Sequence, residues 1–159
     1  MACDAPGRIE FGLMAHVEKS ALVPYSAAQM YVLVDDCERY PEFLPWCGGA
    51  ETPERDATRT LATIHIDYRG IRQSFTTENF KIENTEIQMN LREGPFNQLD
   101  GTWRFQALSD TACKVSLVLD YGFASPLLEK AVGPVFGMIA NTMIERFITR
   151  AEALYGDPV

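Results

Sequence analysis

Apolar and polar residues alternate through the middle of the chain. In the segment RTLATIHIDY, Ala62 and Ile64 share one face of a strand, whereas Thr63 and His65 share the other. The same period of two recurs in four more segments separated by turn residues: IRQSFTTENFKI, TEIQMNLREGP, QLDGTWRFQAL and CKVSLVLDYGF. This pattern predicts an antiparallel meander with one buried face.

The segments on either side of the meander show different patterns. Residues 16–23 read as a first strand, and Ser26, followed three residues later by Gln29, predicts a helix that begins with a capping box. Near the C-terminus, apolar residues recur every three or four positions, which predicts a long amphipathic helix from about Leu127 to Tyr155. Gly133-Pro134 is expected to break or kink the beginning of this helix. The fold class predicted is α+β, a curved antiparallel sheet wrapped around a long C-terminal helix.

Length and composition indicate a single globular domain. Of the 159 residues, 47% are hydrophobic and 23% are charged, as is ordinary for a soluble domain. Residues 1–13 have no clear periodicity, so we expect a disordered extension followed by one domain over residues 14–159. The net charge of −8, from 14 Lys and Arg against 22 Asp and Glu, repels phosphate backbones. DNA is therefore not an expected partner.

The cysteines and histidines do not predict a metal site. The four cysteines lack paired metal-ligand spacing and the density of a disulfide scaffold, which favours reduced thiols and a cytoplasmic location. His16 and His65 are the only histidines, and His65 falls on the polar strand face. No apolar run approaches the ~20 residues that span a bilayer. We therefore expect neither a metal ion nor an integral membrane protein.

The segment YPEFLPWC concentrates aromatic residues in a loop. Pro41 and Pro45 restrict it to turns and at most one helical turn, so Phe43 and Trp46 are presented by a stiff segment. We expect this loop to be the apolar lid or rim of a cavity, rigid enough to lose little entropy on closing. At a water-accessible rim, Trp46→Asp should leave the fold nearly intact. The alternative is a loop that merely plugs one end of the sheet.

Three stretches of the chain resemble one known family. They are YSAAQMYVLVDDCERYPEFLPWC (residues 25–47), GPFNQLDGTWRF (residues 94–105) and SPLLEKAVGPVFGMIANTMIERF in the last helix. They are similar to the coenzyme Q-binding and ribosome association toxin family of the START-like (SRPBCC, polyketide cyclase/dehydrase-type) superfamily. The resemblance implies a helix-grip (START-like, Bet v 1-like) fold with a hydrophobic cavity. These motifs build fold and pocket and do not separate the family's members.

The resemblance implies a non-catalytic carrier or chaperone for ubiquinone or a similar polyprenyl lipid, in support of respiratory electron transport. Such a protein would be cytoplasmic, would contact the surface of the inner membrane transiently, and would need no cofactor besides this ligand. Burial of an isoprenoid tail contributes about 0.8 kcal/mol for each CH₂ group removed from water. The candidate residues for cavity and rim are Phe43, Leu44, Pro45, Trp46, Phe96, Leu99, Trp103, Phe105, Tyr121, Phe123 and Phe136.

Two other functions stay open at this point. A ribosome association toxin would bind the large ribosomal subunit and block subunit joining, yet the arginines are scattered among acidic residues and form no basic cluster. An oligoketide cyclase-like enzyme would need a general acid or base in the pocket, for which Asp67, Tyr68 and Asp120 are candidates. No motif joins these three, so no catalytic residue is assigned. Arg72 and Arg92 would be head-group donors only if they turned inward.

Overall fold

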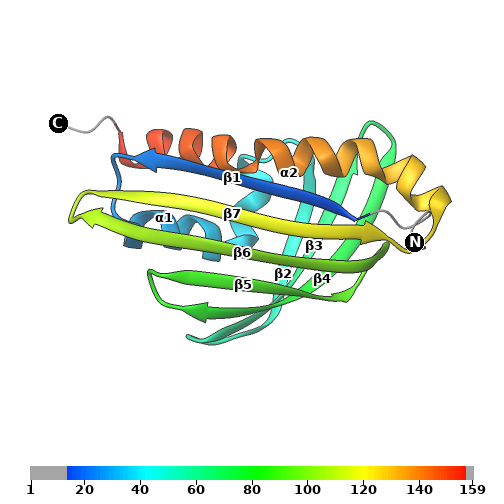
Figure 1. The fold of residues 1–159 in the computed structure, drawn as a ribbon, viewed down its shortest axis with the longest axis horizontal. Helices are drawn as coiled ribbons and strands as arrows, with labels where there is room; N and C mark the ends of the chain where they lie inside the picture. Colours follow the sequence, from blue (N-terminus) through cyan, green and yellow to red (C-terminus); the bar gives the residue numbers. More distant parts are fainter. Residues whose placement is uncertain (1–13, 157–159) are drawn as a thin grey trace, which may run out of the picture.

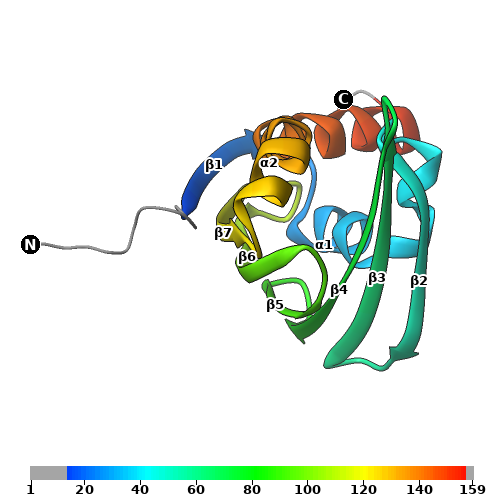
Figure 2. The same cartoon turned by 90° about the vertical axis from the view of Figure 1, so that its right-hand side faces the viewer.

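Seven strands form one curved antiparallel sheet (Figures 1 and 2). The computed structural model describes residues 14–156; residues 1–13, for which we expect a disordered extension, and residues 157–159 lie outside the described residues. The strand order is β1-β7-β6-β5-β4-β3-β2. The strands are β1 (Ala15–Val23), β2 (Cys47–Arg55), β3 (Arg59–Tyr68), β4 (Ile71–Ile82), β5 (Glu86–Glu93), β6 (Phe96–Ser109) and β7 (Ala112–Phe123).

Helices cover the concave face of the sheet. They are α1 (Ala27–Asp35), the short 3₁₀ helix η1 (Cys37–Glu42) and the long α2 (Pro126–Tyr155). Figure 2 shows the sheet curling beneath α2, with α1 and η1 beside the far end of that helix. This arrangement confirms the predicted α+β helix-grip fold.

The start of α1 follows the predicted capping box. Ser26 Oγ accepts a hydrogen bond from the backbone N–H of Gln29 at 3.1 Å, and the Ser26 N–H donates to Gln29 Oε1 at 2.8 Å. These two bonds satisfy backbone donors that a helix start leaves unpaired. The next turns bury Met30 and Val34 against the core.

The long helix α2 is continuous, so of the break or kink expected at Gly133-Pro134, the break does not occur. Ser125 caps its N-terminus by accepting from the N–H of Leu128 at 3.1 Å. The helix continues through Pro134, whose neighbours Val132 and Phe136 are both buried. Their packing holds the helical backbone although proline lacks one N–H donor. Gly156, with φ of 77°, ends the helix.

Strand β2 is the element that the alternation in the sequence does not predict. It contains two adjacent glycines and Pro53, residues that are depleted in strands. Its pairing with β3 has two register shifts, and it forms one edge of the sheet, where such irregularity is tolerated.

Candidate functional site

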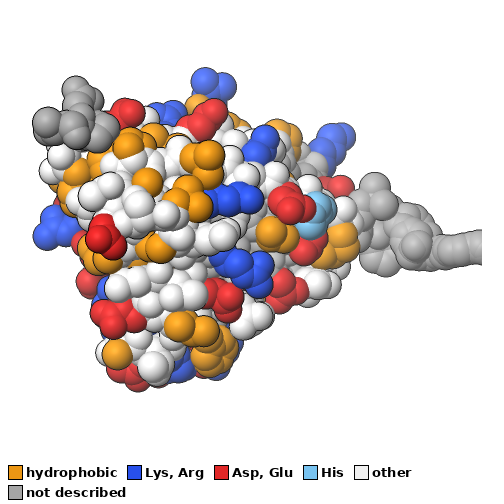
Figure 3. Space-filling model, turned by 60° about the vertical axis from the view of Figure 1, so that its left-hand side comes forward, with side chains coloured by type: hydrophobic (Ala, Val, Ile, Leu, Met, Phe, Trp, Pro, Cys, Tyr) orange, Lys and Arg blue, Asp and Glu red, His pale blue; other side chains and the backbone are white. Residues whose placement is uncertain are grey.

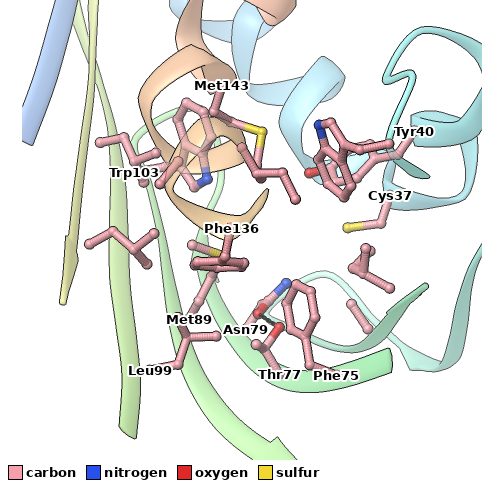
Figure 4. Close-up of a pocket in the computed structure, with 17 residues that line it drawn as sticks. Cys37, Tyr40, Phe75, Thr77, Asn79, Met89, Leu99, Trp103, Phe136 and Met143 are labelled. Atoms are coloured by element: carbon pink, nitrogen blue, oxygen red, sulfur yellow. Dashed lines mark hydrogen bonds between the residues drawn. The ribbon is translucent and has the colours of Figure 1, made fainter. Parts of the chain in front are cut away.

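A cavity lies between α2 and the inner face of the sheet (Figure 4). Its volume is about 70 Å³ when only positions for the centre of a water-sized sphere are counted. It is about 660 Å³ when all atom-free space out to the mouth is included. The sheet contributes Ala62, Ile64, Phe75, Thr77, Asn79, Met89, Leu99, Trp103, Leu117 and Leu119. The helices and the loop after η1 contribute Cys37, Tyr40, Trp46, Phe136, Ile139, Ala140 and Met143. The walls are therefore overwhelmingly apolar.

A strand glycine makes room for part of this wall. Gly101 lies in the middle of β6, on the same face as Leu99 and Trp103. A Cβ atom there would lie 2.6 Å from Met89 Cε and 2.9 Å from Leu119 Cδ1. Real Cβ atoms do not approach other atoms so closely. The absence of a Cβ atom at Gly101 therefore allows the side chains of Met89 and Leu119 to pack directly over the glycine.

Two polar side chains of β4, Thr77 and Asn79, lie together in the cavity lining. Among residues 14–156, the buried polar side chains are Thr60, Thr77, Asn79 and Lys81, and all four lie on β3 and β4. Thr77 Oγ1 donates to Asn79 Oδ1 at 2.7 Å, as the dashed line in Figure 4 marks. Thr60 on β3 lies opposite Asn79 on β4 in the strand register. The Thr60 hydroxyl is buried without a hydrogen-bond partner. Burying polar groups among apolar side chains costs free energy, so their presence here points to a role in binding.

The titratable groups in the wall keep their protons at neutral pH. Burial raises the pKa of the Cys37 thiol to about 11 and raises the pKa of Tyr40 well above its usual range. Tyr40 Oη donates to the carbonyl of Val34 at 2.5 Å. A neutral thiol and an engaged phenol supply neither a nucleophile nor a general base.

Four of the eleven predicted cavity residues line the cavity: Trp46, Leu99, Trp103 and Phe136. Phe96, Tyr121 and Phe123 lie behind this wall and surround Phe136, with ring centroids between 4.7 and 6.4 Å from its ring. They support the lining rather than form it.

The loop residues are placed differently from the expected rim. Trp46 is only 2% exposed and Leu44 only 1%, so the expectation of a water-accessible rim at Trp46 is wrong. The positions of η1 and β2 place the Trp46 indole beneath α2. The loop sequence alone does not predict this tertiary contact. Pro45 is exposed, and Phe43 is partly buried against Phe147, outside the cavity lining. Phe105 is buried against Tyr31 and Trp103 and also lies outside the lining.

The candidate acid–base residues do not meet in the cavity. Asp120 bonds to His16 Nδ1 at 2.5 Å on an exposed part of β1 and β7, and Asp67 lies 3.6 Å from Arg72 near the exposed end of β3. Tyr68 is absent from the cavity lining. Arg92 pairs with Glu78 at 3.0 Å, so neither arginine considered as a head-group donor turns inward.

Residues 14–156 contain no cluster of histidine, cysteine and carboxylate side chains that could hold a metal ion. None of the helices in this described part of the chain combines the length and the apolar character needed to cross a membrane.

The polar corner was missed because β4 reverses the usual pattern. In the segment TTENFKI, Phe80 and Ile82 are 44% and 60% exposed, whereas Thr77, Asn79 and Lys81 are buried. The period of two was visible in the sequence. The sequence did not show which of the two faces is buried, because the apolar residues Phe80 and Ile82 lie on the exposed face.

A curved sheet gripping a helix over an apolar cavity defines the START-like class of helix-grip domains. Residues 23–148 match the family described as "Polyketide cyclase / dehydrase and lipid transport", and the chain belongs to this family. The "Ribosome association toxin RatA" of Pseudomonas aeruginosa is 42% identical over 144 residues, which cover 91% of this chain and 100% of that protein.

The chain is also similar to a more distant relative and to a solved structure. The mitochondrial "Coenzyme Q-binding protein COQ10" of Dictyostelium discoideum is 28% identical, over 87% of this chain and 70% of that protein. The solved structure of a START superfamily protein from Mycobacterium smegmatis has a TM-score of 0.68 at 21% identity, and covers 87% of this chain and 98% of that one. At this identity the structure shows a shared fold only.

Proposed function

We propose that this protein associates with the ribosome, through the large subunit, and so opposes subunit joining. The observation that supports this proposal most strongly is the 42% identity to a ribosome association toxin along that toxin's entire length. The alternative that the sequence left open is thus better supported than the quinone carrier.

The charge distribution limits how the protein would contact the ribosome. Figure 3 shows basic and acidic side chains interspersed on the face it draws. Most arginines are held by carboxylates; for example, Arg55 lies 2.9 Å from Asp35 and Arg104 lies 3.3 Å from Glu86. Because such pairs engage most arginines of the described residues, we expect contacts with ribosomal protein to contribute much of the affinity.

Cosedimentation with purified large subunits across a series of KCl concentrations tests this proposal. We expect the protein to pellet with the subunit and to lose affinity less steeply with salt than a protein that makes many phosphate contacts. An unrelated acidic protein of similar size serves as the control. If the protein stays in the supernatant at every salt concentration, ribosome association is refuted.

A second proposed function is binding of ubiquinone or a similar polyprenyl lipid in the cavity, without catalytic turnover. The observation that favours it is the dry, mostly apolar cavity, whose titratable wall residues Cys37 and Tyr40 stay protonated. The family description includes lipid transport, and one relative is named for coenzyme Q binding.

The tryptophans make this second proposal directly testable. The chain has two, and both Trp46 and Trp103 line the cavity. We expect a bound quinone to quench their fluorescence, and we expect organic extraction of the purified protein to release a quinone. If preparations from quinone-producing cells are empty and added quinone quenches neither tryptophan, the carrier function is refuted, whatever the result with ribosomes.

A further inference from the structure

We propose that Asn79 selects the cavity ligand, favouring a neutral polar end that accepts hydrogen bonds, such as a quinone carbonyl, over a carboxylate. This inference rests on the proposed lipid-binding function and names the feature of the ligand that the wall recognises.

The Asn79 side chain is held with its donor toward the cavity. The residue is 5% exposed, and its carbonyl oxygen is occupied by the hydroxyl of Thr77 at 2.7 Å. Within residues 14–156 the amide nitrogen has no hydrogen-bond partner. Figure 4 shows this nitrogen directed away from Thr77, into the space between the walls. An amide nitrogen carries two N–H donors, so it can serve an acceptor that enters the cavity.

The indole N–H groups beside the cavity are further donors without a partner. Trp103 lines the cavity at 2% exposure, and its indole N–H has no partner among the described residues. The Trp46 N–H is buried and unpaired as well. The hydroxyl of Tyr40 already donates to Val34. A ligand therefore meets the N–H donors of Asn79 and Trp103 in a mostly apolar wall, which suits carbonyl oxygens.

Charge near this corner is already neutralised. The ammonium of Lys81, two residues beyond Asn79 on the same face of β4, lies 3.1 Å from a carboxylate oxygen of Asp35. A ligand carboxylate would thus enter a dry wall without a free cation, which is unfavourable. An alcohol can accept from Asn79 and can donate its own O–H to a lone pair of the Thr77 hydroxyl oxygen, so a neutral hydroxyl is accommodated at this corner.

Competition binding to Asn79→Leu and wild-type protein tests this assignment. The probes are ubiquinone with two isoprene units, geraniol and geranic acid, which carry similar short tails with different polar ends. Quinone binding is read from tryptophan quenching, and the other two are read from displacement of the quinone. We expect wild type to prefer the quinone and Asn79→Leu to bind it about tenfold more weakly, the factor that corresponds to ~1.4 kcal/mol. Geraniol, which can also accept from Asn79, should lose affinity in the same direction, whereas the weaker binding of geranic acid should change less than about threefold.

Two further variants separate recognition from packing. Met89→Leu alters an apolar wall residue and should change the affinity for every probe by less than about threefold. The double variant Thr77→Val/Asn79→Leu removes both partners of the buried bond, so it should melt no lower than wild type while its preference for quinone over geranic acid falls about tenfold.

The outcomes are distinct. If Asn79→Leu or the folded double variant prefers the quinone over geranic acid as strongly as wild type does, or if the affinity for all three probes falls equally, the role of Asn79 is refuted while lipid binding stands. If wild type binds none of the probes, the cavity function itself fails, and this inference fails with it.

Discussion

Replacing Trp46 by aspartate should unfold the protein rather than leave its fold intact. The Trp46 side chain is 2% exposed, and truncation of a buried tryptophan costs about 3–5 kcal/mol. The new carboxylate would add a desolvation penalty, since no cation is placed to pair with it in the apolar wall. The sum reaches or exceeds roughly 5 kcal/mol, whereas whole domains are stable by only about 5–15 kcal/mol.

Thermal unfolding followed by circular dichroism measures this effect. For a domain of this size about 1 kcal/mol shifts the midpoint by roughly 2–4 °C, so we expect a loss of at least ~10 °C or no folded protein. Pro45→Asp is the matched control: it places the same charge one residue away at an exposed position and should cost less than about 1 kcal/mol. A Trp46→Asp protein that melts within a few degrees of Pro45→Asp would show that Trp46 is not enclosed as described.

Three more predictions concern other parts of the molecule. Asp35→Asn should lower the free energy of unfolding in urea by about 3–5 kcal/mol, because the Lys81 ammonium, 3% exposed, would lose its carboxylate partner. Ser26→Ala should cost about 1 kcal/mol in the same assay through loss of the helix cap. The hydrogen bond to Asp120 raises the pKa of His16 above 6.5, so its stabilising effect is fully present below that pH and is lost as pH rises through the folded-state pKa. An NMR titration of His16 should show a lower pKa in Asp120→Asn; an unchanged value would contradict the pairing.

Local sequence signals were sufficient to predict most of the fold. Ser26 and Gln29 lie within one turn of each other, so their capping box could be recognised without knowledge of distant contacts. The alternation in β3 placed Ala62 and Ile64 on the buried face, as the structure shows. Strand β2 escaped detection because its pairing with β3, not its composition, makes it a strand.

The cavity depends on contacts that local signals do not contain. Trp46 was correctly chosen as a lining residue but was placed at the surface, because its burial results from packing beneath a helix about ninety residues later in the chain. Asn79 was not considered at all, since a polar residue in an alternating strand is ordinarily assigned to the wet face. A buried amide next to a buried threonine becomes visible only when the inner face of β4 is known.

The pairing of β1 with β7 has a consequence for how the protein is made. Val17 lies opposite Leu119, and the hydroxyl of Tyr25 donates to the carbonyl of Gly156, 131 residues later, at 2.9 Å. The first strand thus has no partner until β7 has been synthesised, and the sheet lacks its long covering helix α2 until the last residues are free. Contacts of such long range slow folding to the millisecond-to-second regime and expose apolar strands meanwhile. Nascent chains that end before α2 should therefore depend on chaperones and be readily degraded.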